Sequence, residues 1–304
     1  MWNNKRFHSL NYALKEEFGE KIYKVSLDGG FTCPNRDGKV GTRGCIFCSD
    51  AGSGEFAGSR KKTITEQIED QLELISKKFP EGRVIAYFQN FTNTYGEVEY
   101  LESIYREALS HPRVAGLAIA TRPDAIPEDV LELLDRLNKD HFIWIELGLQ
   151  TMHDRTAEFI NRGYDLDVFD SSAKSLIKRN IRVVVHLIAG LPYEKIEDIL
   201  ETVSYINDLK VWGVKIHLLH VIRDTALHRI YMDKEFPLME EQEYIDLVCH
   251  IISRLSPEIV IHRLTGDGSR DTLIGPLWSL NKRRVLNAID KTLKVKDIIQ
   301  GCEK

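Results

Sequence analysis

VAGLAIATRPDAIPEDVLELLDRLNKDHFIWIELGLQ, residues 114–150, contains the repeating pattern that decides the fold. An apolar run at 114–121 comes first, a helical pattern with Pro127 near its first turn follows at 127–139, and a second apolar run occupies 142–150. Two short buried strands separated by a helix form a βαβ unit, whose strands pair in parallel. The stretch therefore predicts one step of an α/β fold with a parallel sheet.

The same alternation continues on both sides of this stretch. Further apolar runs predict strands at 21–27, 83–89, 181–192, 213–222 and 258–264, and helical patterns occupy 64–79, 98–110, 240–255 and a tail from about Leu277. Six βα units before residue 222 suit a TIM-like barrel, complete or partial, better than two small domains. We predict a partial (β/α)6 barrel over 21–235, with an N-terminal extension over 1–20 and a C-terminal α/β extension over 236–304 packed on it.

The composition is that of a globular protein with a sizeable core, since 43% of its residues are hydrophobic and 29% charged. The first residues lack the apolar core of a signal peptide, and no apolar run reaches the length of a membrane span, so we expect a cytoplasmic protein without membrane contact. A net charge of −5 argues against broad nucleic-acid binding but leaves room for local basic clusters at 60–62 and 281–284.

Three of the five cysteines lie in CPNRDGKVGTRGCIFC, residues 33–48. In a reducing compartment such a cluster indicates metal or redox chemistry rather than disulfides. Cys33, Cys45 and Cys48 are one ligand short of a structural zinc site, for which His8 is a conceivable fourth donor. Three thiolates also suit a [4Fe–4S] cluster with one iron left free. The spacing alone leaves both metals open, and coincidence as well.

The cysteine loop resembles that of radical S-adenosylmethionine (SAM) enzymes, which carry C-x3-C-x2-C with an aromatic residue before the last cysteine. The eleven-residue first gap departs from that spacing but is similar to the Elp3-like branch of the superfamily. The closest likeness is to the YhcC/YtqA group, and it extends over roughly residues 5–300. The segments that carry it are CPNRDG (33–38), YFQNFTNTY (87–95), TRPD (121–124), IELGLQT (145–151), HLIAGLP (186–192), HRLTGDG (262–268) and GPLWSLNK (275–282).

The resemblance implies an enzyme whose [4Fe–4S] cluster, held by the three cysteines, chelates SAM and cleaves it to a 5′-deoxyadenosyl radical. It also implies an electron donor such as flavodoxin or ferredoxin. Phe47 is expected against adenine, Arg162 at the SAM carboxylate, and His186 at the ribose, although a core role suits His186 almost as well. Glu146 is expected in the site or in a structural ion pair. The other expected SAM contacts are Gln89, Asn90, Thr92, Thr121, Gln150 and Gly190.

The Elp3 likeness implies tRNA as substrate, modified at carbon-5 of the wobble uridine. The segment after the barrel is too short for the acetyltransferase domain of Elp3, so we expect the enzyme to remodel a substituent already in place. The specific prediction is conversion of carboxymethylaminomethyl-uridine to aminomethyl-uridine, with a tRNA methyltransferase acting downstream. Arg263 and Asp267 after the barrel, and the basic residues Arg60, Lys61 and Arg283, are the expected substrate contacts. The alternatives are a small-molecule radical SAM enzyme resembling coproporphyrinogen dehydrogenases, and a zinc-bound RNA adaptor without catalysis.

Overall fold

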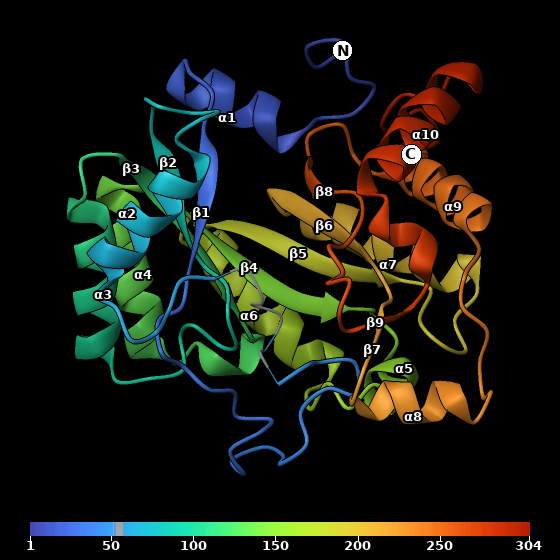
Figure 1. Cartoon of the computed structure of the whole chain (residues 1–304), viewed down its shortest axis with the longest axis horizontal. Coiled ribbons are helices and arrows are strands. Elements are labelled where there is room, and N and C mark those ends of the chain that lie inside the picture. Colours follow the sequence, from blue (N-terminus) through green and yellow to red (C-terminus); the bar gives the residue numbers. More distant parts are fainter. Residues whose placement is uncertain (51, 53–56) are drawn as a thin grey trace.

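A seven-stranded parallel sheet forms the centre of the molecule (Figure 1). The computed structural model describes residues 1–50, 52 and 57–304. The strands are β1 (Tyr23–Leu27), β2 (Val84–Phe88), β3 (Val114–Thr121), β4 (Phe142–Gln150), β5 (Arg182–Ala189), β6 (Gly213–Leu218) and β8 (Val260–Arg263). They lie in the order β1-β2-β3-β4-β5-β6-β8, so each strand pairs with the next one along the sheet. The sheet curls into a half-barrel, which confirms the predicted partial barrel and adds a seventh strand to it.

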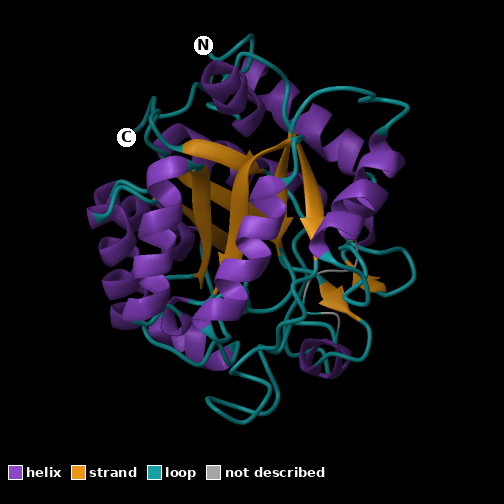
Figure 2. Ribbon diagram, turned by 90° about the vertical axis from the view of Figure 1, so that its left-hand side faces the viewer, coloured by secondary structure: helices purple, strands orange, loops and turns teal. Residues whose placement is uncertain are grey.

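Helices pack along the sheet, and the strand arrowheads point toward an end that is rich in loops (Figure 2). They are α1 (Leu10–Phe18), α2 (Ile64–Ile75), α3 (Val98–Ser110), α4 (Glu128–Asp140), α5 (Asp154–Phe159), α6 (Leu166–Lys178), α7 (Ile196–Leu209), α8 (Ala226–Met232), α9 (Glu241–Arg254) and α10 (Lys282–Val295), with 3₁₀ turns η1 (Pro123–Ala125) and η2 (Leu277–Leu280). None of these helices, in the ranges that the structure describes, has the length and apolar character needed to cross a membrane.

Local sequence signals set where several helices begin. At α2 the Thr63 side chain accepts a hydrogen bond from the Glu66 amide, and the Glu66 carboxylate accepts one from the Thr63 amide, which forms a capping box. The Asn281 side chain likewise caps α10 by accepting from the Arg284 amide. Because these side chains satisfy backbone N–H groups that have no partner inside the helix, they fix the helix start next to each strand end.

The predicted strand at 213–222 is divided in two. β6 ends at Leu218, and β7 (Val221–Ile222) then pairs in antiparallel fashion with β9 (Leu273–Gly275), forming a second, two-stranded sheet. The predicted tail helix is also shorter than expected, because η2 precedes the start of α10 at Lys282. These changes bring the chain after β6 and the start of α10 to the loop-rich end of the barrel. The predicted domain boundaries at residues 20 and 235 stay predictions. β8 lies beyond residue 235 and nevertheless belongs to the barrel sheet.

The N-terminal segment covers the outer edge of β8. The Ile261 amide donates to the His8 carbonyl at 2.7 Å, and Ser9 forms an isolated bridge with Ile261. The Gln300 side chain joins the same place, since it accepts from the His8 amide at 2.7 Å and donates to the Ser256 and Ile259 carbonyls. The last strand is therefore paired on its outer side, although no further strand of the barrel follows it.

Candidate active site

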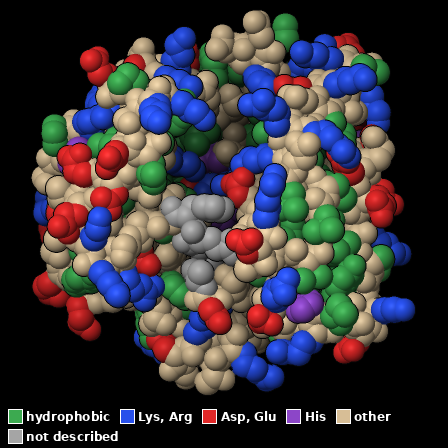
Figure 3. Space-filling model, in the orientation of Figure 1, with side chains coloured by type: hydrophobic (Ala, Val, Ile, Leu, Met, Phe, Trp, Pro, Cys, Tyr) green, Lys and Arg blue, Asp and Glu red, His purple; other side chains and the backbone are tan. Residues whose placement is uncertain are grey.

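A cavity of about 730 Å³ opens at the carboxyl ends of the strands. Its wall includes residues from the cysteine loop, from the loops after β2, β3, β4 and β6, and from the segment after β8. Figure 3 shows that this face of the molecule is hollowed in the middle and that Lys and Arg side chains gather around the hollow. Parallel strands bring residues that are far apart in sequence to one edge, and this is where α/β barrels place their chemistry.

Cys33, Cys45 and Cys48 are not joined in disulfide bonds, and all three line this cavity. Turns hold the loop in shape, since the Arg36 amide donates to the Cys33 carbonyl at 2.8 Å and the Cys48 amide to the Cys45 carbonyl at 3.0 Å. The Arg36 guanidinium also donates to the Cys48 carbonyl at 3.0 Å. Burial raises the pKa of the Cys45 thiol to about 12, and the neighbouring Cys48 adds to that rise. The thiols are thus close enough to influence one another and share one space.

This donor set fits an iron–sulfur cluster. The three thiols line a cavity with room for a body larger than a single ion, and thiolates are the ligands that iron–sulfur clusters use. A cluster held by three protein ligands keeps one metal position for a further ligand from the cavity.

Seven of the residues predicted to hold SAM line the cavity. They are Phe47, Gln89, Thr92, Thr121, Glu146, Gln150 and His186. Thr92 is buried, and its hydroxyl has no hydrogen-bond partner in the described part of the chain, so it offers a polar contact to a ligand. Gln89 accepts a hydrogen bond from Ser26 at 3.2 Å. Gln150 has the left-handed backbone φ of 67°, which turns the chain sharply at the mouth of β4.

Three predicted SAM contacts lie outside the cavity wall. The guanidinium of Arg162 is buried and donates to the carbonyls of Leu149 and Thr151, each at 2.7 Å, so it holds the loop after β4 instead of facing the cavity. The Asn90 amide donates to Asp28 at 2.8 Å. Gly190 has a φ of 83° and lies beside Met239. In this structure these residues shape the loops that carry the cavity residues.

Glu146 combines the two roles expected for it, since it lines the cavity and forms a buried ion pair. Its carboxylate, 1% exposed, accepts from Lys215, from Trp144 Nε1 at 2.9 Å and pairs with His186 Nε2 at 2.9 Å. Burial acts to raise the pKa of Glu146, but the Lys215 ammonium and the His186 hydrogen bond outweigh it and hold that pKa well below its usual range. The carboxylate is therefore ionised, and it orients His186 at the cavity wall.

The structure adds cavity residues that sequence reasoning missed. Lys215 and His217 lie two positions apart on β6 and face the same side of the strand, and His220 follows the strand end. Tyr87 on β2 accepts from Lys215 Nζ at 3.0 Å. A lysine and a histidine at alternate positions of an otherwise apolar strand are the signal that would have marked them, because neither residue type is commonly buried without a partner.

The predicted substrate contacts are divided between the cavity and the surface. Arg263 and Asp267 line the cavity and form an ion pair at 3.0 Å. Lys61 and Arg283 are exposed and do not line it. Arg60 does not line the cavity either, and its guanidinium pairs with the Asp28 carboxylate at 3.1 Å.

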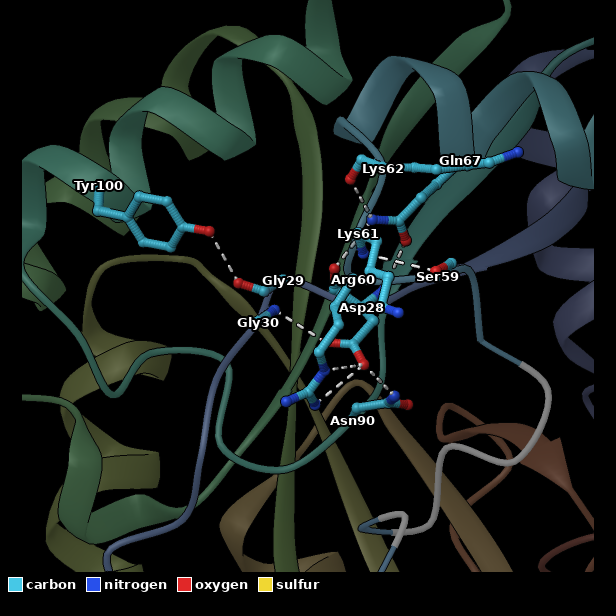
Figure 4. Close-up of polar contacts among 10 residues, drawn as sticks. All are labelled: Asp28, Gly29, Gly30, Ser59, Arg60, Lys61, Lys62, Gln67, Asn90 and Tyr100. Carbon is cyan, nitrogen blue, oxygen red and sulfur yellow. Dashed lines mark hydrogen bonds and ion pairs between the residues drawn. The ribbon is translucent and has the colours of Figure 1, made fainter.

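Figure 4 shows the clasp that Arg60 forms at the base of the cysteine loop. Asp28 accepts from both Arg60 and the Asn90 amide through one carboxylate oxygen, and from the Gly30 amide through the other. Gln67 on α2 holds the backbone of Asp28 from the other side, accepting from its N–H at 2.9 Å and donating to its carbonyl at 3.0 Å. The clasp ties the two ends of the cysteine loop to the loop after β2.

Two consecutive parts of the chain match known family models. The model described as Radical SAM superfamily matches residues 38–206, and the model described as Radical SAM C-terminal domain matches residues 211–295. Together the two matches include Cys45, Cys48 and the cavity residues up to the start of α10, while Cys33 lies just before the first match.

Curated relatives match nearly the whole chain. The uncharacterized protein YtqA of Bacillus subtilis is 46% identical over 98% of this chain and 92% of its own length. Protein YhcC of Escherichia coli is 35% identical over 92% of this chain and 90% of its own length. The tRNA uridine(34) acetyltransferase of Methanocaldococcus jannaschii is 26% identical over 51% of this chain, which is only 29% of that protein.

Among solved structures, Elp3 from Methanocaldococcus infernus superposes with a TM-score of 0.70 at 18% identity, over 92% of this chain. The chain spans 64% of that structure, so less than two thirds of its length. Coproporphyrinogen III oxidase from Escherichia coli gives a TM-score of 0.50 at 15% identity, over 77% of this chain and 52% of its own. At these identities the two superpositions show a shared fold.

Proposed function

Because the chain belongs to the radical SAM superfamily, in the group of YtqA and YhcC, we propose that its cavity holds a [4Fe–4S] cluster on Cys33, Cys45 and Cys48. Enzymes of this superfamily use such a cluster together with SAM, so the chain is a radical SAM enzyme with these two cofactors. The observation that supports this placement is that the three thiols line the same cavity as Thr92, whose buried hydroxyl has no hydrogen-bond partner among the described residues.

The residues of the chain position the cofactors and exclude water. When bound, the cluster and SAM supply a radical that removes a hydrogen atom from the substrate. Phe47 offers an aromatic face for adenine, while Gln89, Thr92 and Gln150 offer polar atoms at the loops after β2 and β4. Arg162 acts indirectly, since its hydrogen bonds hold the loop that follows Gln150. The Arg60–Asp28 clasp acts in the same way on the cysteine loop.

The substrate in this proposal is tRNA, modified at carbon-5 of the wobble uridine. Its support is the partial match to a tRNA uridine(34) acetyltransferase and the fold shared with Elp3. The cavity is large enough to receive an extruded base, as enzymes that act on nucleobases require. Lys61 and Arg283, exposed on the surface, are proposed to contact the RNA backbone.

The reaction proposed is conversion of carboxymethylaminomethyl-uridine to aminomethyl-uridine. A hydrogen atom and then an electron would leave the methylene next to the carboxylate, with SAM as the oxidant, and water would hydrolyse the resulting C=N bond to the amine and glyoxylate. A low-potential donor such as flavodoxin or ferredoxin would reduce the cluster, and a tRNA methyltransferase would act on the product. We propose a cytoplasmic location, where a reducing environment would keep the site cysteines out of disulfide bonds.

The experiment that tests the proposal measures 5′-deoxyadenosine formation by anaerobically reconstituted protein. Dithionite and SAM are supplied with bulk tRNA from a strain lacking this gene, or without tRNA. We expect cleavage that tRNA accelerates, loss of the cluster absorbance in Cys45→Ala, and normal absorbance in Cys302→Ala, whose cysteine is exposed and outside the cavity. Mass analysis of the wobble nucleosides identifies the product. Cleavage that tRNA leaves unchanged would move the substrate to small molecules, and colourless, zinc-binding protein would refute the cluster assignment.

A further inference from the structure

One part of the cavity wall comes from the C-terminal family match and is not used in the proposed SAM contacts. It consists of the end of β6, the segment after β8 and the start of α10. Its charged and imidazole side chains that line the cavity are Lys215, His217, His220, Arg263, Asp267 and Lys282. Lys215 is buried in its ion pair with Glu146, and none of the other side chains in this set has a role in the proposed SAM contacts.

Positive charge exceeds negative charge on this wall. Arg263 and Lys282 both pair with the single carboxylate of Asp267, which accepts from Arg263 through one oxygen and from Lys282 through the other. This set has two cations and one anion, so a further anionic group would be attracted to the wall.

Two imidazoles on the wall have a free hydrogen-bonding atom. In the described residues, Nε2 of His217 and Nε2 of His220 have no hydrogen-bond partner. Burial lowers the pKa of His217 well below its ordinary value and that of His220 to about 4, so both rings are neutral near pH 7. The His220 ring packs on Gly266, where an added Cβ would come within 2.9 Å of ring Cε1. The His220 ring is thus held by its packing, and Nε2 of each ring can still form a hydrogen bond with a ligand.

We propose that this wall is an anion subsite, in which Arg263 and Lys282, assisted by His217 and His220, bind a carboxylate of the substrate. The inference rests on the proposed function and specifies it, because the carboxylate would belong to the carbon-5 substituent of the uridine. A guanidinium matches a carboxylate through two parallel N–H donors, and Arg263 is the residue of this wall that can do so.

The position inside the cavity favours a carboxylate over a backbone phosphate. A wobble base that enters an enclosed site leaves the stack with its base edge and substituent foremost, while the ribose–phosphate chain stays at the rim. Phosphate contacts strengthen the binding of every RNA alike, whereas this subsite would distinguish RNAs by the substituent alone. Binding measurements on RNAs that differ only in the substituent can therefore distinguish a carboxylate ligand from a backbone phosphate.

The test measures binding of two anticodon stem-loop RNAs to the holoenzyme with cluster and SAM, by fluorescence anisotropy under anaerobic conditions. The RNAs differ only at the wobble uridine, which carries carboxymethylaminomethyl in one and aminomethyl in the other. Arg263→Gln should weaken binding of the carboxylate RNA by about tenfold, or ~1.4 kcal/mol, and that of the aminomethyl RNA by less than about twofold. Arg106→Gln on α3 is the matched control, since it also removes a guanidinium paired with an acidic side chain, there Glu102, outside the cavity.

A second variant keeps the test independent of folding damage. Asp267→Asn frees both cations, so it should tighten binding of the carboxylate RNA by about twofold to fivefold. Equal weakening of both RNAs by Arg263→Gln would assign the wall to phosphate and overturn the subsite while leaving tRNA as substrate. Weaker SAM binding in the absence of RNA would assign it to SAM and also overturn it. Failure of both RNAs to bind the native protein would refute the tRNA substrate together with the subsite.

Discussion

Replacing Lys215 by methionine should be among the most damaging single changes in the barrel. Lys215 is 2% exposed and Glu146 is 1% exposed, so neither charge can be hydrated in the folded state. Without the ammonium, the hydrogen bonds left to the Glu146 carboxylate among the described residues are those with Trp144 Nε1 and the His186 ring, each at 2.9 Å. Breaking a buried pair by removing one partner costs about 3–5 kcal/mol, and we expect a loss of unfolding free energy in that range.

The double variant Lys215→Met with Glu146→Gln provides the decisive comparison. It removes both charges, while the amide oxygen can still accept from Trp144, so we expect it to recover about 2 kcal/mol or more of the loss. Denaturant unfolding of the cluster-free protein under anaerobic conditions gives all the values. Lys139→Met on α4, which removes an exposed lysine paired with Asp135, is the control and should change stability by less than about 0.5 kcal/mol. Additive costs, with coupling below about 0.5 kcal/mol, would refute the description of Lys215 and Glu146 as a coupled buried pair.

Three further predictions concern the cavity and its supports. Cys45→Ser should retain the far-UV circular dichroism of the native protein but lose iron, sulfide and SAM cleavage after reconstitution; full iron content would contradict its role as a ligand. Asp28→Asn should weaken the clasp with Arg60, lower stability by about 1–3 kcal/mol, and broaden the cluster's electron paramagnetic resonance signal, whereas an unchanged signal would show that the loop is held by other contacts. Because burial lowers the pKa of His220 to about 4 from its ordinary 6.5, the unfolded state binds more protons between these values. Stability should therefore be fully present above pH 6.5 and fall toward pH 4, less steeply in His220→Asn, as the denaturation midpoint at each pH would record; equal slopes would refute the contribution of His220.

The barrel could be predicted because its strands are buried on both faces. Such strands are continuous apolar runs, and the predicted strands at 114–121 and 142–150 coincide with β3 and β4. The helix predicted at 98–110 coincides with α3. β7 and β9 were not predicted, because two or three residues have no periodicity of their own and pair only through a contact distant in sequence. The apolar run at 213–222 does not reveal that the chain leaves the main sheet within it.

The site was predictable to the level of loops but not of side-chain directions. The cysteine loop and the loops after β2, β3, β4 and β6 line one cavity, as strand polarity requires, whereas the loop after β5 does not line it. Arg162, however, faces its own loop, because Leu149 and Thr151 carbonyls needing donors lie beside it. The alternation of Lys215 and His217 marks His217 in sequence as unusual, but its place beside Arg263 depends on the pairing of β6 with β8. Charge balance on that wall depends on contacts between three segments, which no local pattern encodes.

The hydrogen bonds that join the two ends of the chain have a consequence for how the protein opens. His8 and Gln300, which they connect, are separated by 292 positions, so this contact closes one of the longest loops in the molecule and should form after the sheet has folded. A contact that forms late at the margin of a domain is also expected to open early, in a partial unfolding that leaves the barrel folded. Opening would expose the outer N–H and C=O groups of β8, which can pair with the same edge of another molecule. Slow aggregation on mild warming is then expected to begin from molecules whose cavity is still intact, and removal of the N-terminal segment should accelerate it.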